Sequence, residues 1–275
     1  MTSVSLFAGA ILSSARATMS GRSDMANEER PPDLSARLAL RERPRGSPLM
    51  FQTWGKLLFM HWPVPVAALR PLVPEALSLD TYEGRAWAAL TPFTLWGLRP
   101  RFVPELPGIS RFHELNVRTY VHHRGVPGVW FFSLDAARLL PVIGARLFFH
   151  LPYHQAEMSL EERGATIDYR SRRLGRPPRP AEFRTVWATG APLPIALPGS
   201  LEFFLVERYC LYAVHRGRIF RARIHHAPWP LREATVSELA STMFEAAGFA
   251  TPGGKPLLHN GGPVRVEVWP LQRVE

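Results

Sequence analysis

The chain has 275 residues and a formal net charge of +10; 46% of its residues are hydrophobic and 11% are aromatic. This length supports a sizeable core, and the aromatic content excludes global disorder. Of the 33 basic residues only Lys56 and Lys255 are lysines, so 31 are arginines. The positive charge makes nucleic acid a candidate partner of this protein. A general bias toward arginine explains the charge better, because the sequence has no patches of lysine.

The first 48 residues predict a mostly mobile tail that carries a short helix at Leu34–Arg41. Residues 49–275 then form a single domain. The 27 prolines disfavour a helical bundle. No apolar run approaches the ~20 residues that span a bilayer. Cys210 is the only cysteine, which excludes an intrachain disulfide and fits a cytoplasmic location.

Strand patterns dominate the domain, starting with an apolar run at Trp54–Trp62. Four strand pairs are each separated by a short glycine-containing turn: Leu77–Asp80 with Arg85–Trp96, Arg111–His123 with Val129–Asp135, Tyr153–Glu161 with Thr166–Arg173, and Cys210–His215 with Arg218–His225. Single strands are predicted at Glu182–Thr189 and Val264–Trp269.

Helical patterns are few and short. They are predicted as one turn at Pro65–Leu69, a short helix followed by a strand within Ala136–Phe149, a helix at Leu201–Arg208 capped by Ser200, and a helix from Thr235 or Ser237 through Ala247. Several hairpins with so few helices indicate an antiparallel sheet that closes or packs in two layers. The predicted fold is mainly β, a barrel or sandwich with peripheral helices.

The most informative strand runs from Phe112 to Val121. Alternate residues share a face, so Glu114, Asn116, Arg118 and Tyr120 form one polar row. If this row faces solvent, the strand is half-exposed and the row implies no functional site. If it faces a barrel lumen, it forms a polar pocket wall with an ion pair built in.

Other candidates lie at element boundaries. Arg208 and Tyr209 lie where a predicted helix ends and a strand begins, and there they would bind an anion or cap the helix C-terminus. Tyr153 is a candidate proton donor and His154 a candidate base, although a lone histidine at a strand start is more often a surface residue. His61 joins the ligand-binding candidates.

Metal and cofactor motifs are missing from the sequence. The adjacent pairs His122-His123 and His225-His226 point to opposite faces of a strand, which is poor chelation geometry. Nucleophile-elbow, dinucleotide and phosphate-loop motifs are absent. We therefore expect no metal and no cofactor. A basic stretch from Arg170 to Arg179 lacks interleaved aromatic residues, which favours a solvated loop over a nucleic-acid site.

Together these segments resemble the YqjF-like family of uncharacterised bacterial proteins, within the acetoacetate decarboxylase-like superfamily. The resemblance covers roughly residues 50–270. It is carried by Phe59-Met60-His61-Trp62, Leu72-Val73-Pro74, Asp80-Thr81-Tyr82-Glu83-Gly84, the strand from Glu114 to Tyr120, Gly128 to Asp135, Leu151-Pro152-Tyr153, Glu207-Arg208-Tyr209 and His226-Ala227-Pro228-Trp229.

The resemblance implies a closed, cone-like antiparallel β-barrel with an enclosed pocket into which Glu114 and Arg118 point. Acetoacetate decarboxylase forms a Schiff base through a lysine activated by a neighbouring lysine. Tyr153 and His154 stand where those two lysines are expected, whereas Glu114 matches a pocket glutamate. The scaffold and one carboxylate therefore carry over, and the nucleophile does not.

The favoured hypothesis is a protein that binds a small organic carboxylate or carbonyl compound in a polar barrel pocket. Arg118 or Arg208 would pair with its anionic group. One alternative is a lyase or decarboxylase-like enzyme that uses Glu114, Tyr153 and His154 for acid–base chemistry. Another is a non-enzymatic binder of nucleic acid or an anionic surface through arginines, although nucleic acid is disfavoured. A homo-oligomer stays open.

Overall fold

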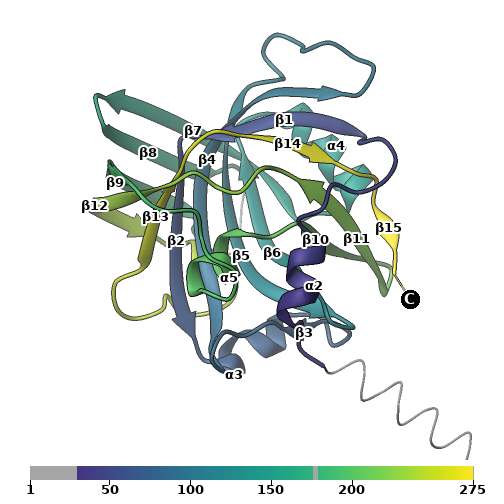
Figure 1. The fold of residues 1–275 in the computed structure, drawn as a ribbon. Helices are drawn as coiled ribbons and strands as arrows, with labels where there is room; N and C mark the ends of the chain where they lie inside the picture. Colours follow the sequence, from purple (N-terminus) through teal and green to yellow (C-terminus); the bar gives the residue numbers. More distant parts are fainter. Residues whose placement is uncertain (1–29, 176–178, 275) are drawn as a thin grey trace, which may run out of the picture.

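A computed structural model describes residues 30–175 and 179–274 (Figure 1). Within them the strands are β1 (Met50–Gly55), β2 (Leu57–Val64), β3 (Ser78–Leu79), β4 (Ala86–Pro100), β5 (Phe112–His123), β6 (Val126–Ala136), β7 (Tyr153–Arg163), β8 (Thr166–Arg173), β9 (Glu182–Pro192), β10 (Cys210–His215), β11 (Arg218–His225), β12 (Leu231–Ser241), β13 (Leu257–Gly261), β14 (Val264–Val268) and β15 (Gln272–Arg273). The helices are α2 (Leu34–Ala39), α3 (Val66–Leu69), α4 (Leu139–Phe149), α5 (Leu201–Val206), α6 (Met243–Ala246) and a 3₁₀ turn, η1 (Arg70–Leu72).

Hydrogen-bonded strands close into two rings that share β4, β5 and β6. The first ring runs β1-β14-β11-β10-β6-β5-β4 and returns to β1. The second runs β6-β7-β8-β9-β12-β13-β2-β4-β5 and returns to β6. In Figure 1 the second ring extends toward the left, where β7, β8, β9 and β12 lie. The predicted mainly β, ring-like closed fold is thus confirmed, but the sheet is mixed, because β6 pairs in parallel with both β7 and β10.

Because it belongs to both rings, β5 is buried on its two faces. Leu115 and Val117 pack inside the second ring with Tyr169 and Trp187. Tyr120 belongs to the separate core of the first ring. Side chains of a strand alternate between its faces, so Glu114, Asn116 and Arg118 project into the first ring.

Parallel strands need a crossover, and α4 supplies it between β6 and β7. The strand predicted at the end of Ala136–Phe149 was therefore wrong, because this whole segment is needed to bridge the two strands. The helix predicted from Thr235 or Ser237 to Ala247 was also wrong. Residues of β12 pair with β9 up to Ser241, and only the four-residue α6 is helical.

Three of the four predicted hairpins are confirmed, as β5–β6, β7–β8 and β10–β11. The fourth is not a hairpin, since β3 pairs with β5 rather than β4. The predicted cap of α5 is confirmed: the Ser200 side chain accepts a hydrogen bond from the backbone N–H of Phe203. None of the described helices is both long and apolar enough to cross a membrane.

The segment before β1 runs along the barrel. Residues 1–29 of the predicted tail lie outside the described residues. The short helix predicted at Leu34–Arg41 is present as α2, and its N-cap Asp33 accepts a hydrogen bond from the backbone N–H of Ala36. Arg37 of α2 forms an ion pair with buried Asp80, and Arg223 of β11 donates to the carbonyl of Leu40. Residues 30–48 thus make specific contacts with the barrel.

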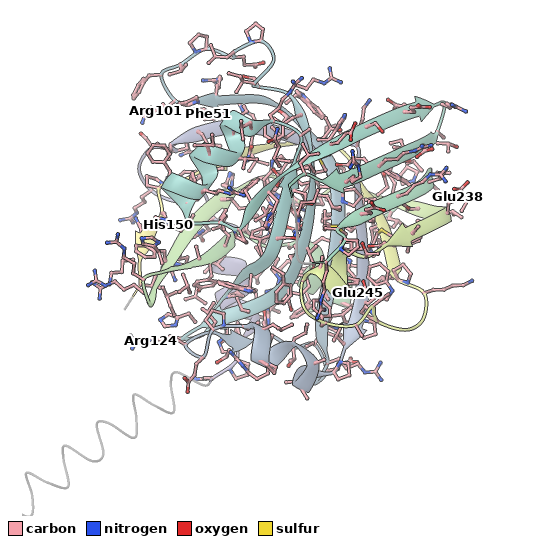
Figure 2. All side chains as sticks on the ribbon, turned by 180° about the vertical axis from the view of Figure 1, so that it is seen from behind. Phe51, Arg101, Arg124, His150, Glu238 and Glu245 are labelled. Atoms are coloured by element: carbon pink, nitrogen blue, oxygen red, sulfur yellow. The ribbon has the colours of Figure 1, made fainter. Side chains whose placement is uncertain are left out.

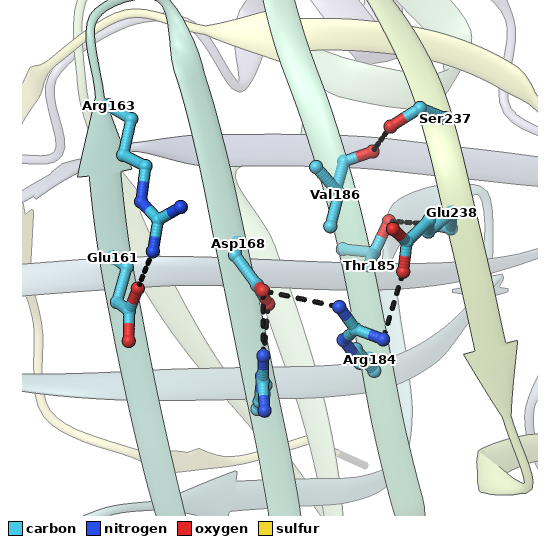
Figure 3. A network of polar contacts seen from close by, with 9 residues as sticks. Glu161, Arg163, Asp168, Arg184, Thr185, Val186, Ser237 and Glu238 are labelled. Atoms are coloured by element: carbon cyan, nitrogen blue, oxygen red, sulfur yellow. Dashed lines mark hydrogen bonds and ion pairs between the residues drawn. The ribbon is translucent and has the colours of Figure 1, made fainter.

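Three of the arginines between 170 and 179 are paired on a strand rather than free in a loop, and Arg179, beyond this strand, donates a hydrogen bond to the carbonyl of Glu245. Arg170, Arg172 and Arg173 lie on β8, where they pair with Asp168, Glu157 and Asp135. Figure 3 shows the exposed part of this network, in which Arg184 joins Asp168 to Glu238. These pairs neutralise much of the basic stretch, which weakens it further as a nucleic-acid site. Arg176 lies outside the described residues.

Two of the ion pairs of β8 predict contrasting effects on stability. Asp135 and Arg173 are both buried, with side-chain exposures of 0% and 8%. We expect Asp135→Ala to lower the free energy of unfolding by ~3–5 kcal/mol, because it leaves a buried charge unpaired. As a control, Asp168→Ala breaks a more exposed pair and should change stability little. Urea denaturation of both variants checks this, and equal effects would contradict it.

Candidate functional site

A cavity of about 530 Å³ lies inside the first ring. Most of its wall is apolar, and aromatic side chains supply much of the surface: Trp54, Phe59, Phe93, Phe131, Phe149 and Trp229. A small number of polar groups interrupt this wall: Gln52, Thr91, Ser110, Glu114, Asn116, Arg118, Tyr153, Arg208 and His226. Such a composition is typical of sites for small organic molecules. A more open hollow of about 750 Å³ over Arg111, Arg138 and Glu157 brings together no buried unpaired polar atom among the described residues.

The polar row of β5 forms one wall of the cavity. Glu114, Asn116 and Arg118 all line it, and they lie opposite Phe93, Thr91 and Ala89 on β4. Tyr120 is fully buried beside them. Of the two orientations left open by the sequence, the structure has this row inside the barrel.

Glu114 has Tyr153 as its partner, and the structure records no ion pair between Glu114 and Arg118 among the described residues. The Tyr153 hydroxyl donates to Glu114 Oε2 at 3.0 Å. Burial raises the pKa of Glu114 to about 8, although the hydrogen bonds from Tyr153 and Asn116 oppose this rise. Glu114 is therefore mainly protonated at neutral pH, as a carboxylic acid that can donate a hydrogen bond into the cavity.

Two arginines from distant parts of the chain meet around Tyr120. The guanidinium carbons of Arg118 and Arg208 lie 5.8 and 4.6 Å from the centre of the Tyr120 ring. Arg118 also lies over the ring of Phe59, at 5.5 Å. Aromatic faces favour a cation at these distances, so the rings hold both guanidinium groups at one part of the cavity wall.

Both arginines keep N–H groups that are buried and unused. Arg118 Nε and Nη2 and Arg208 Nη2 have no hydrogen-bond partner among the described residues. Both ring nitrogens of nearby His61 are likewise unpaired within that part of the chain. Burial, reinforced by the charges of Arg118 and Arg208, holds the pKa of His61 well below its ordinary value, so this imidazole is neutral. Leaving these buried donors unpaired costs free energy, and an anion that accepted their hydrogen bonds would remove this cost.

Arg208 is fixed in place by α5 and Asp80. Its Nε donates to the carbonyl of Phe204 and its Nη1 to Asp80 Oδ2, each at 2.6 Å. Asp80 also receives two hydrogen bonds from Arg37, at 2.6 and 2.8 Å. Burial raises the pKa of Asp80, but Arg208 and Arg37 outweigh it and keep this carboxyl below its ordinary pKa. One carboxylate thus partners two arginines, so a ligand anion would find positive charge in excess.

Four predicted site residues do not line the cavity: His61, Tyr120, Tyr209 and His154. Tyr209 donates its hydroxyl hydrogen bond to Glu207, whose other oxygen accepts from the backbone N–H of Trp229 at 3.0 Å. His154 lies on the opposite face of β7 from Tyr153, where burial and Arg173 lower its pKa to about 4. The structure therefore does not bring His154 together with Glu114 and Tyr153.

The sequence analysis did not single out Asp80 or His226 as site residues. His226 lines the cavity and stacks on Tyr209, with ring centres 4.7 Å apart. Both residues belong to the motif blocks that carry the family resemblance, and this was the signal available. Among the described residues no group of three or more His, Cys, Asp or Glu side chains could hold a metal ion.

Comparison with known proteins places the chain in a family. A model of uncharacterised conserved proteins, DUF2071, matches residues 51–265. The chain belongs to the DUF2071 family. It is 45% identical over 235 residues to the uncharacterised protein YqjF of Bacillus subtilis (strain 168), which covers 84% of this chain and 94% of YqjF. The resemblance to YqjF-like proteins is thus confirmed.

Solved structures place this DUF2071 member among acetoacetate decarboxylase-like folds. The enduracididine biosynthesis enzyme MppR, complexed with pyruvate, gives a TM-score of 0.57 at 11% identity, covering 84% of this chain and 92% of MppR. An acetoacetate decarboxylase-like enzyme from Sphingomonas wittichii RW1 gives 0.56 at 12%, covering 84% and 94%. Acetoacetate decarboxylase from Legionella pneumophila gives 0.56 at 10%, covering 85% and 92%. At these identities the likeness shows the fold alone.

The raised pKa of Glu114 predicts a pH-dependent stability. Between its ordinary pKa of 4.5 and about 8 the folded state holds a proton that the unfolded state has lost. Stability contributed by this group therefore falls as pH rises across that window. We expect Glu114→Gln to flatten the fall, because glutamine does not ionise. Urea denaturation at several pH values measures it, with the exposed Glu157→Gln as control. An unchanged slope in Glu114→Gln would refute the assignment.

Proposed function

We propose that the protein binds a small organic carboxylate with an apolar body inside the first ring. The observation that carries this proposal is the set of buried, unpaired N–H groups of Arg118 and Arg208 in the cavity wall. A carboxylate satisfies a guanidinium through charge-assisted hydrogen bonds, which are stronger than those between neutral groups. The aromatic remainder of the wall suits the apolar body of the ligand.

Glu114 and Tyr153 supply a second polar contact on the same wall. A protonated Glu114 donates a hydrogen bond, so it suits a carbonyl or hydroxyl oxygen of the ligand. The pyruvate bound to MppR, a protein with the same fold, is a small acid with both a carboxylate and a carbonyl group. These features together favour keto acids and hydroxy acids as the ligand class.

The positions of the two lysines support non-covalent binding. Lys56 forms an ion pair with Glu162 and does not line the cavity, and Lys255 is exposed in the segment between α6 and β13. A Schiff base needs a lysine in the pocket beside the substrate carbonyl. We therefore propose that this chain lacks the nucleophile of acetoacetate decarboxylase.

Paired probes test the contribution of the carboxylate. We expect 3-phenylpropionate to raise the melting temperature in a thermal-shift assay, and the isosteric neutral 3-phenylpropanamide to raise it little. Arg118→Ala should weaken binding of the carboxylate by about 1.5–3 kcal/mol, the range for hydrogen bonds to charged groups. Arg118→Lys keeps the charge but loses the planar fork, so we expect an intermediate effect.

Arg163→Gln is the matched control, since Arg163 is exposed at the end of β7 and does not line the cavity. Each variant is first checked for folding by circular dichroism. If the carboxylate and the amide bind equally, or if Arg118→Ala keeps the full shift with the carboxylate, the proposed anion site is wrong.

A second candidate function is acid–base catalysis next to a carbonyl group. The hydrogen-bonded pair of Glu114 and Tyr153, with the pKa of Glu114 raised to about 8, favours it. In its ionised form Glu114 would accept a proton from the carbon next to a ligand carbonyl. His154, the third residue of the predicted catalytic set, faces away and is not needed for this step.

Proton exchange tests this chemistry. We expect the protein to speed exchange of the C3 hydrogens of phenylpyruvate with deuterium, followed by NMR in D₂O. The rate should rise toward pH 8 as Glu114 ionises. Glu114→Gln should abolish the acceleration, and Tyr153→Phe should shift its pH dependence. Exchange at the uncatalysed rate, or acceleration that survives Glu114→Gln, would reject this candidate.

Nucleic-acid binding has little support in the described residues, because the densest basic stretch is paired with carboxylates. A cytoplasmic location stays a prediction based on the single cysteine, Cys210, which is buried on β10.

A further inference from the structure

The mouth of the cavity is surrounded by exposed apolar side chains. They come from the loop between β4 and β5, from helix α4 and, in the case of Leu49, from the residue just before β1, and all three places line the cavity. Phe102 is 87% exposed and Phe148 is 72% exposed. Smaller exposed side chains continue the surface: Leu49, Val103, Leu106, Leu139 and Ile143. We call these seven residues the apolar rim. Half of the large hydrophobic residues that are exposed in the described chain lie in this rim, which is more than scattered surface positions explain.

The figures agree on the location of the rim. In Figure 1 the loop between β4 and β5 and helix α4 lie at the same, upper end of the barrel. In Figure 2, seen from behind, Phe51 and Arg101 mark this end, and His150, which follows α4, lies between it and Arg124. Arg124 marks the opposite end. The rim therefore forms one end of the barrel, around the entrance to the cavity.

The same two segments are basic. Residues 99–111 and 138–149 hold five arginines and one carboxylate, Glu105: Arg99, Arg101, Arg111, Arg138 and Arg146. Within the described part of the chain none of these arginines forms an ion pair. The Arg101 guanidinium lies over the Phe102 ring at 5.0 Å, which places a cation and an exposed aromatic group side by side.

We propose that the apolar rim and its arginines dock on the surface of an anionic lipid bilayer. Aromatic and aliphatic side chains that project among arginines are the combination that binds this interface, since the apolar groups enter the acyl boundary and the cations face lipid phosphates. Docking in this orientation brings the entrance of the cavity to the bilayer, where carboxylates with apolar bodies partition.

The charge of the rim distinguishes this partner from a second copy of the chain. In a two-fold dimer formed through this face, the same patch meets itself, so the five arginines of each copy would face one another. Like charges at an interface are repulsive, and only Glu105 is available to compensate them. An anionic bilayer complements both the charge and the apolar surface.

Vesicle sedimentation tests the proposal with the full chain. We expect binding to phosphatidylcholine vesicles that contain 25% phosphatidylglycerol, weaker binding to phosphatidylcholine alone, and a loss of binding as salt increases. The double variant Phe102→Ser/Phe148→Ser should reduce partitioning to the anionic vesicles by about tenfold or more. Leu197→Ser is the matched control, because Leu197 is 71% exposed near α5 and lies outside the rim. It should bind as the wild type does.

The double variant Arg101→Gln/Arg138→Gln separates the electrostatic contribution to membrane binding from the apolar contribution. We expect it to lower binding to the anionic vesicles by about tenfold while leaving the weak binding to phosphatidylcholine unchanged. Because all four substituted side chains are exposed, their melting temperatures should match the wild type.

Three results would overturn the proposal. The first is no binding of the wild type to anionic vesicles at low salt. The second is an equal loss in Leu197→Ser and in Phe102→Ser/Phe148→Ser, which would mean that the apolar rim is not the contact surface. The third is a dimer in analytical ultracentrifugation that the Phe102→Ser/Phe148→Ser variant dissociates, which would assign the rim to a second copy. Thermal shifts with 3-phenylpropionate report on the cavity separately, so the two proposals fail independently.

Discussion

Burial of both faces of β5 is the constraint on which the site depends. A strand at the edge of a single sheet can leave its polar face in water, but β5 belongs to two closed rings. Its apolar face completes the core of the second ring. Its other face carries a carboxyl, an amide and a guanidinium into a mostly apolar lumen, where each group must be partnered, neutralised or left to bind a ligand. Glu114 is partnered by Tyr153 and neutralised, whereas Arg118 keeps free donors.

Charge compensation then links the cavity to the N-terminal segment. Arg208 is buried beside Arg118, and the only carboxylate that it contacts within the described chain is Asp80. Asp80 in turn holds Arg37 of α2, so the contact that fixes this segment on the barrel also orients a guanidinium in the cavity wall. Two arginines around one aspartate leave net positive charge at this end of the lumen. The electrostatics of the site therefore include Arg37, which lies 22 positions before the first motif block, Phe59-Met60-His61-Trp62.

The acetoacetate decarboxylase-like fold here encloses a carboxyl and two guanidinium groups in its lumen. Its closed lumen desolvates whatever side chains point inward, and desolvation is the physical factor that shifts a pKa in either kind of site. In this chain it acts on a carboxyl and keeps it protonated. The fold thus presents a hydrogen-bonding acid and guanidinium groups to the cavity. The apolar rim adds a surface around the entrance, and its composition is independent of the chemistry inside.

Local sequence pattern was enough to predict many of the strands and turns of this protein. Alternation placed Glu114, Asn116 and Arg118 on one face, glycine turns marked three hairpins, and Ser200 marked the start of α5, because these signals depend on neighbours in sequence. Which face of β5 turned inward was decided by ring closure. The partner of Glu114, the separation of His154 from Tyr153, and the role of Asp80 depend on strands and helices that are distant in sequence. Residues 235–241 likewise form a strand because their backbone groups pair with β9. A helical capping pattern reports only on neighbouring residues, so it cannot predict this pairing.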